Sequence, residues 1–358
     1  MMSLKKLVTL AFVCLATLTG CNSAEDEPQG KPTEVNFIIK VSASHGMQSP
    51  DGAAHKASRD YADATPGELI GTLRFIIVRP DGTVEHNRYY DFRDSETLEY
   101  EQKFVVQSGE TKKVYLIANE ETTWTNGTKV VNYDFDSILE GNAFPESDYK
   151  NILITLNSNS QELPLPLVMS ECRTVAVPAF SSSNNEFSSQ LFIVRAATKF
   201  TFNIINHSTD NFTINSLAID KLARKQYFLP QSTTGETQYN DAGEVLDYIV
   251  PSIGNNEYYT FTKSSFASNN IPVGTTLTLD PIYLLEGKYT DAASAGKNYK
   301  ITLTMNGGVD YSEYFPNLSQ LPRNTHVVVN VTFSEKSVNW EAKIYPYLSV
   351  ELKPGLGF

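Results

Sequence analysis

The stretch Leu73-Arg-Phe-Ile-Ile-Val-Arg-Pro-Asp-Gly-Thr83 shows the pattern that most of this chain repeats. Apart from Arg74, Leu73 to Val78 is apolar and rich in β-branched and aromatic side chains, which favour strands. Pro80 to Thr83 then has the Asp-Gly composition of a hairpin turn. A short apolar strand closed by a tight turn, without a helical period, predicts an all-β fold.

The same pattern recurs along the chain. Val114 to Ala118 predicts a buried strand that ends at Asn119, and Asp136 to Leu139 predicts a short helical turn capped by Asp136. The polar cluster 181–185 separates two patterned halves, so we expect two β-sandwich domains, 60–183 and 184–337. Further strands are predicted at Ile152–Leu156, Leu163–Val168, Gln190–Val194, Lys199–Ile205, Phe212–Ile219, Thr276–Leu279, Tyr299–Met305 and His326–Phe333.

Composition narrows the classes of function. A net charge of -12 argues against nucleic acid, because phosphate binding needs clustered Lys and Arg. Cys14 lies in the N-terminal apolar segment and Cys21 closes it, which leaves Cys172 without an intramolecular disulfide partner. We expect Cys172 to be a buried, unreactive thiol. With 41% apolar residues, 19 Tyr and 19 Phe, the chain can build a packed core.

The N-terminus predicts export. Lys5 and Lys6 precede an apolar run that ends at Leu18, too short for a membrane span of about 20 residues. Its end, Leu18-Thr-Gly-Cys21, resembles the lipobox of bacterial lipoproteins, so residues 1–21 are predicted to be a lipoprotein signal peptide with lipidation at Cys21. An ordinary signal peptide that ends near a cysteine is the alternative. Residues 22–34 then form an acidic tether, either a surface-export signal or a solvated spacer.

A strand and a long loop follow the tether. Val35, Phe37, Ile39 and Val41 alternate with residues that are mostly polar, which is the period of a strand. The loop from Ser42 to about Gly71 is rich in small and polar residues, and compact domains rarely carry such a loop without a functional reason. The pair Arg59-Asp60 contains the only arginine between Cys21 and Arg74. Because such loops are preferred sites of proteolysis, Arg59 is either a cleavage site or simply an exposed residue.

The C-terminal end has a second apolar pattern. From Trp340 to Lys353 apolar residues continue past the last core strand, and Leu348, Val350 and Leu352 alternate with polar neighbours. Pro346 interrupts the run and favours an edge or a break. With Ile344 or Tyr347, these residues could form a strand donated to another molecule, and we assign residues 338–358 to such a tail. A final strand paired within its own domain is the alternative.

Catalytic and metal-binding motifs are missing from the sequence. None of the five histidines has the i, i+4 spacing of a helical zinc site, and the sequence contains no cysteine pair for a metal, no P-loop and no Gly-x-Ser-x-Gly elbow. We therefore expect no catalytic residue, no metal and no cofactor. A β-sandwich hydrolase is the least favoured class.

Five segments together resemble the fimbrillins, the subunits of type V pili of diderm bacteria. They occur in the family's order and cover most of the chain: Leu73–Gly82, Val114–Asn119, Leu165–Ser170, Leu191–Phe200 and Leu321–Asn330. The third departs from the family's frequent Pro-Met pair. The resemblance implies two tandem transthyretin-like Greek-key β-sandwiches. It also implies an outer-membrane lipoprotein precursor, processed by the lipoprotein signal peptidase and by an arginine-specific protease that cuts the loop after the first strand.

Under this scheme the cut removes the strand of Val35, Phe37, Ile39 and Val41 together with the tether, so residues 22–59 leave. The C-terminal tail of another pilus subunit fills the groove, and the product is a cell-surface fimbrium that supports adhesion. Two alternatives stay open: a lipid-retaining anchor or tip accessory subunit, and a monomeric surface lipoprotein that binds glycans or host proteins through exposed aromatic residues.

Overall fold

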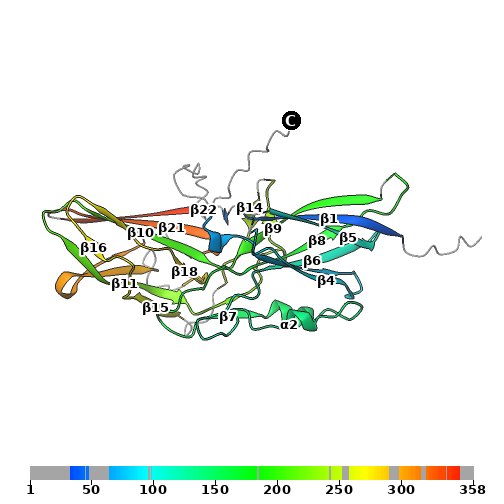
Figure 1. The fold of residues 1–358 in the computed structure, drawn as a ribbon, viewed down its shortest axis with the longest axis horizontal. Coiled ribbons are helices and arrows are strands. Elements are labelled where there is room, and N and C mark those ends of the chain that lie inside the picture. The colour runs from blue at the N-terminus through cyan, green and yellow to red at the C-terminus, as the bar shows by residue number, and fades with distance from the viewer. Residues whose placement is uncertain are drawn as a thin grey trace, which may run out of the picture.

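The computed structural model describes residues 33–44, 46–47, 64–95, 97, 99–183, 185–241, 243–251, 258–289, 298–315, 320–335 and 337–346. The predicted all-β class is confirmed, because strands dominate and helices are limited to short turns. Figure 1 shows an elongated molecule with two halves joined end to end. The first half contains β1 (Glu34–Ala43), β2 (Gly46–Met47), η1 (Pro66–Glu68), β3 (Thr72–Val78), β4 (Val84–Asp91), β5 (Glu99–Gln107), β6 (Thr111–Ala118), η2 (Phe135–Ser137), α2 (Glu146–Lys150), β7 (Leu153–Thr155), β8 (Met169–Ala176) and β9 (Glu186–Arg195).

The second half is also built from strands. Two sheets make up most of it, with the orders β17-β10-β21-β22 and β15-β11-β19-β20. Its elements are β10 (Thr198–Asn206), β11 (Phe212–Ala223), β12 (Lys225–Tyr227), β13 (Gln238–Tyr239), β14 (Glu244–Asp247), β15 (Tyr258–Lys263), β16 (Asn270–Ile271), β17 (Thr276–Thr278), β18 (Ile282–Leu284), β19 (Lys300–Met305), η3 (Asn306–Gly308), β20 (Val309–Tyr314), β21 (Thr325–Phe333) and β22 (Val338–Pro346).

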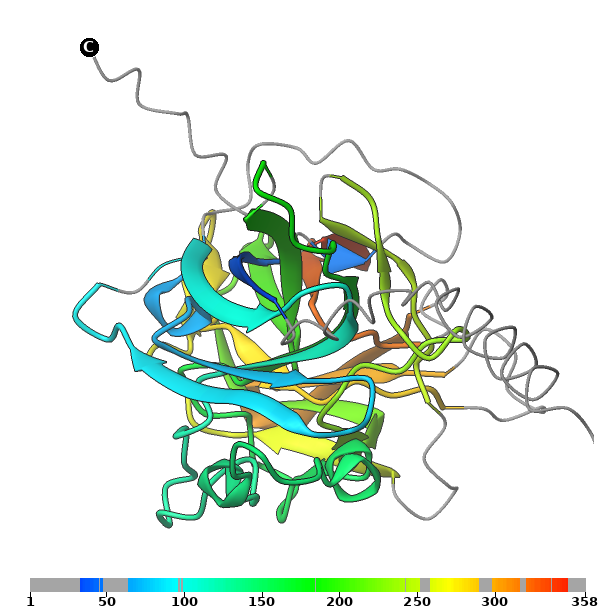
Figure 2. The same ribbon diagram turned by 90° about the vertical axis from the view of Figure 1, so that its right-hand side faces the viewer.

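The first half has three layers. Its sheet has the order β4-β3-β6-β8-β9-β1-β5, but β8 and β9 share only the pairs Met169–Arg195 and Ser170–Val194. The sheet therefore folds on itself, with Phe75 of β3 lying 5.1 Å from Phe104 of β5 between ring centroids. Residues 119–168 form the third layer on the opposite face of β3 and β6, as Figures 1 and 2 show.

Two apolar clusters fill these layers. Strands β3 and β6 alternate, so that Phe75 and Leu116 face β1 while Ile76 and Tyr115 face the other way. The cluster around Tyr115 continues without interruption into the second half, where Phe200 is one of its members. The two halves thus share one core and pack as a single unit.

Several sequence expectations are corrected by the fold. Leu163–Val168 is not a strand, because Pro164 and Pro166 each lack the N–H that a ladder needs. The short helical turn is η2, and its cap is the Asp134 side chain rather than Asp136. The strand predicted at Gln190–Val194, within the second domain, is part of β9 of the first sheet, and the first strand of the second half, β10, follows Ala196 and Ala197.

Asn119 explains why the strand ending at Ala118 stops where it does. Its backbone is left-handed, with φ of 57°, a conformation that asparagine tolerates. The side-chain Oδ1 accepts hydrogen bonds from the backbone N–H groups of Gly71 and Thr72, at 2.9 and 3.1 Å. Its Nδ2 donates to the carbonyls of Leu69 and Leu167, at 2.9 and 2.7 Å. One buried amide therefore satisfies four backbone groups from two separate loops.

We expect Asn119→Ala to lower the free energy of unfolding by about 2–4 kcal/mol, because it leaves buried backbone groups without partners. Chemical denaturation followed by tyrosine fluorescence measures the change. Asn126→Ala is the matched control, since Asn126 caps only an exposed turn through Thr128 N–H, and it should change stability by less than about 0.5 kcal/mol. Equal effects of the two variants would contradict this role of Asn119.

Candidate functional site

Strand β1 is the central strand of a three-stranded layer. It runs antiparallel to β5, from Glu34 opposite Gln107 to Ser42 opposite Glu99. It runs parallel to β9, ending with Ala43 opposite Ile193. Among the described residues, β5 forms ladder pairs only with β1. We call the space between β5 and β9 the β1 slot, and its occupant joins β5 to the rest of the sheet.

The inner face of β1 is fully buried in the slot. Val35, Phe37, Ile39 and Val41, the four residues predicted to point inward, are 0–3% exposed. Phe37 stacks on Phe187, with 5.6 Å between ring centroids. Burial of these side chains contributes about 6–12 kcal/mol before ordering costs. The apolar face of β1 is therefore a main source of cohesion in this layer.

The end of β1 is held at Ser44 by both halves of the molecule. Ser44 N–H donates to the Ile193 carbonyl at 2.8 Å, and its hydroxyl donates to the Gly243 carbonyl at 2.9 Å. The Ser44 carbonyl accepts from Asn324 Nδ2 at 3.2 Å and from Arg195 Nη1 at 3.4 Å. Ser44, Arg195 and Asn324 are all buried, so we call this arrangement the Ser44 joint.

A buried ion pair stabilises the junction beside the Ser44 joint. Lys199 Nζ lies 2.7 Å from Glu68 Oε1, and the Tyr283 hydroxyl donates to the same carboxylate at 2.9 Å. Arg195 Nε donates to the Glu68 carbonyl at 3.0 Å. Burial alone would raise the pKa of Glu68, but the Lys199 charge and the hydrogen bonds outweigh it, so the pKa is lowered from 4.5. The first half thus supplies the carboxylate and the Thr65 N–H that donates to it, and the second half supplies Lys199 and Tyr283.

The N-terminal segment continues past the Ser44 joint to a strap, defined here as residues 231–249. Gly46 and Met47 of β2 pair in parallel with Glu244 and Val245 of β14 in this strap. The strap begins and ends at an isolated bridge between Gln231 and Ile249. The segment that contains β1 is therefore paired with the second half of the chain as well as with the first.

The strap packs on the first half through Tyr239. The Tyr239 ring lies 5.3 Å from that of Phe192, and its hydroxyl donates to the buried carboxyl of Glu171. Gly243 of the strap has φ of +77°, and a Cβ there would lie 2.5 Å from the Phe192 ring, so only glycine fits. Burial raises the pKa of Glu171 to about 7, and the hydrogen bonds from Tyr239 and Cys172 N–H only partly offset it.

The first part of the predicted donor tail forms β22, which pairs with β21 of the same chain. The pairing runs from Val338 opposite Phe333 to Pro346 opposite Thr325, and Ile344 lies opposite Val327. In the region described, β22 is an edge strand. Residues 338–346 therefore pair within their own domain in this conformation.

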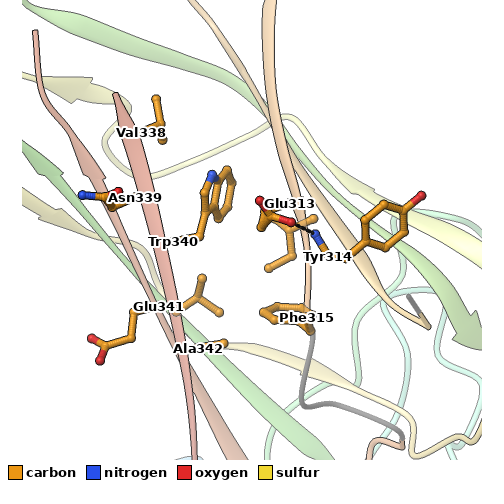
Figure 3. A pocket seen from close by; sticks show the side chains of 10 residues that line it. Glu313, Tyr314, Phe315, Val338, Asn339, Trp340, Glu341 and Ala342 are labelled. Atoms are coloured by element: carbon orange, nitrogen blue, oxygen red, sulfur yellow. Dashed lines mark hydrogen bonds between the residues drawn. The ribbon is translucent and has the colours of Figure 1, made fainter. Parts of the chain in front are cut away.

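A cleft of about 290 Å³ separates β22 from β20, the edge strand of the other sheet. Figure 3 shows Trp340 pointing across it toward Glu313 and Phe315, while Asn339 and Glu341 point away. Its floor is apolar and includes Ile301, Val329 and Phe315. The second sandwich is thus open along one flank.

The remaining predicted site residues cannot be placed. Cys21, Arg59, Asp60, Tyr347, Leu348, Val350 and Leu352 lie outside the described residues. The structure adds Ser44 and Glu68, which sequence reasoning missed. Nothing local marks Ser44, because its partners Gly243 and Asn324 lie more than a hundred positions away. Glu68 has a local signal, the capping box that it forms with Thr65, but its ion pair with Lys199 bridges a long stretch of sequence. Arg195, Lys199 and Asn324 belong to segments quoted for the family resemblance, but their shared joint appears only in the fold.

Among the residues with assigned structure, no group of three His, Cys, Asp or Glu side chains could hold a metal ion. In the same part of the chain, no helix has the length and apolar character needed to cross a bilayer.

The fold is similar to those of two bacterial proteins of known structure. A candidate cell adhesion protein from Parabacteroides distasonis matches with a TM-score of 0.54 and 15% identity, covering 88% of this chain and 98% of that one. The tip fimbrial protein Mfa3 from Porphyromonas gingivalis, with a C-terminal truncation, matches with a TM-score of 0.53 and 12% identity, covering 88% and 100%. No protein-family model and no curated protein sequence matches the chain. The predicted likeness to the fimbrillins is confirmed at the level of the fold.

The pKa of Glu171 predicts how stability depends on pH. The unfolded carboxyl loses its proton near its ordinary pKa of 4.5, whereas the folded one keeps it up to about 7. Stability therefore falls as pH rises through this window, by up to about 3 kcal/mol. Glu171→Gln should remove that dependence and be more stable than the unmodified protein at pH 8, as measured by denaturant unfolding at pH 5 and pH 8. The exposed Glu186→Gln is the control, and a variant less stable at pH 8 would contradict the assignment.

Proposed function

We propose that this protein is a non-enzymatic structural subunit of a cell-surface pilus, made as a lipoprotein precursor and assembled by exchange of strands between subunits. One observation carries the proposal. A strand with a fully buried apolar face, β1, occupies a central position in its layer, yet it belongs to the N-terminal segment that precedes the single arginine of the 42–71 loop. A cut after Arg59 would break the covalent link between β1 and the rest of the chain, including β5 and β9, the two strands that β1 joins.

Loss of β1 would create a site that accepts only an extended strand. The facing edges of β5 and β9 would lose their ladder partners, from Glu99 to Gln107 and from Glu186 to Ile193. The apolar cluster beneath, which includes Phe75 and Leu116, would lose its cover. Unpaired backbone groups over an apolar floor are the features that recruit another strand.

The C-terminal tail has the pattern that such a slot requires. Leu348, Val350 and Leu352 repeat with the period of β1, and Ile344 and Tyr347 precede them. If each subunit offers a tail and accepts another, the contact is heterologous and does not close on itself, so it generates a filament. The partners are then other pilus subunits in a homopolymer or a mixed fimbrium.

Lipidation and maturation complete the proposal. Cys21 would hold the precursor in the outer membrane after the lipoprotein signal peptidase has acted. An arginine-specific protease would cut between Arg59 and Asp60 and release the lipid, the tether and β1 together. The mature protein would then act at the surface, in fimbria that support adhesion.

The pairing of β22 with β21 favours a second candidate. If β22 and the tail stay with their own domain, the chain cannot donate a strand. A lipid-retaining anchor or a tip accessory subunit, which needs only one assembly element, would suit that state.

Strand acceptance can be tested with a labelled peptide. The acceptor is the protein ending at Pro346 and cut after Arg59, and the probe is a fluorescent peptide of residues 338–358. We expect binding with release of the 22–59 fragment, and no binding to the uncut acceptor. A peptide with Leu352→Asp should bind at least about 100-fold more weakly, because a charge would enter the apolar slot. Lys353→Asp, in the outward phase, is the control peptide, and equal weakening by both would contradict strand insertion.

Maturation at Arg59 has its own test. An arginine-specific endoprotease should convert the full chain into a product that begins at Asp60, identified by mass spectrometry. Arg59→Ala should remain uncut in this loop and form no multimers on a sizing column. Lys56→Ala is the matched control in the same loop and should be cut and assembled normally. Normal assembly of Arg59→Ala would show that this bond is not the maturation site.

A further inference from the structure

Strands β8 and β9 of the first sheet separate beside the junction. In the described residues they share only two ladder pairs, at Met169 and Ser170 of β8. Glu171, the next residue of β8, accepts a hydrogen bond from the Tyr239 hydroxyl of the strap, and Tyr239 also packs on Phe192 of β9. One side chain from the second half therefore bridges two strands of the first half where their ladder ends.

Further side chains dock the strap on β8. Arg173 donates a hydrogen bond to the Thr237 carbonyl, and its guanidinium lies 5.3 Å from the centroid of the Tyr239 ring. Thr174 donates to the Glu236 carboxylate from its backbone N–H, at 3.1 Å, and from its hydroxyl. Among the described residues the strap forms ladder pairs with β2 and none with β8. Its docking on the first half thus depends on side chains.

The same strap holds the end of the N-terminal segment. The Gly243 carbonyl accepts from the Ser44 hydroxyl at 2.9 Å, and β14 then pairs with β2. Gly243 N–H donates to the Asn240 carbonyl at 2.9 Å, and Glu244 N–H donates to Asn240 Oδ1 at 2.9 Å. These bonds fix the turn that follows Tyr239. The docked side chain and the hydrogen bond to Ser44 therefore belong to one compact hairpin.

We propose that the strap is a clasp that holds the N-terminal segment at the junction, and that the clasp loosens when the buried Glu171 carboxyl loses its proton. The inference concerns the uncut chain, so it holds or fails independently of the proposed cut at Arg59. It makes the hold on the last residues of β1 depend on pH.

Glu171 is the titratable group on which the clasp depends, because its side chain is buried. The groups around it are Arg173 on its own strand, Tyr239 and Thr237 on the strap, and Leu116 on β6. Of these only Arg173 carries a charge, and burial outweighs its effect, so the docked carboxyl has a pKa of about 7. If the strap lifts, water reaches the carboxyl and its pKa returns toward 4.5. Docking therefore weakens as the pH rises from about 5 to about 7.

Amide hydrogen exchange of the full chain, corrected for intrinsic exchange rates, tests the clasp. Gly243→Ala should push the strap off the first half, because its Cβ would lie 2.5 Å from the Phe192 ring. We expect protection to fall at least about 10-fold in residues 238–240 and 41–44, while β10 keeps its protection. Gly235→Ala is the matched control. Gly235 also has a positive φ, of +88°, but nothing lies within 4 Å of its Cβ, so protection at 41–44 should be unchanged.

The dependence on pH is measured in the same way. In the unmodified protein, protection of residues 41–44 should fall at least about 10-fold between pH 5 and pH 8. Glu171→Gln has a polar side chain that does not ionise, so protection should change by less than about 2-fold over this range. Glu186→Gln, at an exposed carboxyl of β9, is the control and should keep the pH dependence of the unmodified protein.

Two results would overturn the inference. If Gly243→Ala lowers protection in the strap but not at residues 41–44, the strap does not hold the N-terminal segment. If Glu171→Gln keeps the pH dependence of the unmodified protein, the clasp does not respond to this carboxyl. Should Gly243→Ala unfold the whole chain, so that β10 also loses protection, Glu171→Gln decides alone, because its expected effect is a gain of protection at pH 8.

Discussion

The structure depends on the burial of one apolar strand face between β5 and β9. β5 has no other ladder partner in the described part of the chain, and β9 meets β8 through only two residue pairs. Without an occupant in the slot, the layer of β9, β1 and β5 would lose its continuity, and the departure of Phe37 would uncover Phe187 and the apolar cluster around Phe75. The slot requires a strand with apolar side chains at alternate positions, and it does not require one particular sequence. On the proposed function, an extended strand from another subunit with alternating apolar side chains would meet this requirement.

The contacts at the junction connect the end of β1 to both halves of the molecule. Ser44 is bound by Arg195 from the first sheet, by Asn324 from the second, and by Gly243 from the strap. Beside it, the buried pair of Glu68 and Lys199 joins the halves whether or not the N-terminal segment is present. The common core continues across the same boundary. The two halves should therefore stay together when β1 leaves, while the strap loses its pairing with β2.

The sequence predicted the strands with strong alternation or long apolar runs, such as β1, β3, β6, β10 and β21. It missed β4, β5 and β20, because edge strands carry charged or polar residues on their exposed faces and lack a clear apolar run. It also predicted a strand at Leu163–Val168, because the segment is apolar, although its two prolines lack the N–H groups that a strand ladder needs. The alternation of Val35, Phe37, Ile39 and Val41 located the occupant of the slot correctly. The slot itself could not be predicted, because β5 and β9 meet β1 only through pairings across long stretches of sequence.

On the proposed function, strand exchange would need a cut in the chain, because a free strand could hardly compete with a β1 that is still covalently attached. While β1 is attached through the 42–71 loop, it is always present at its own slot, and a free strand would have to outcompete that local concentration. A cut after Arg59 changes β1 into a separate molecule that dilution can remove. On the proposed function, proteolysis therefore removes the advantage of proximity that keeps β1 in its slot.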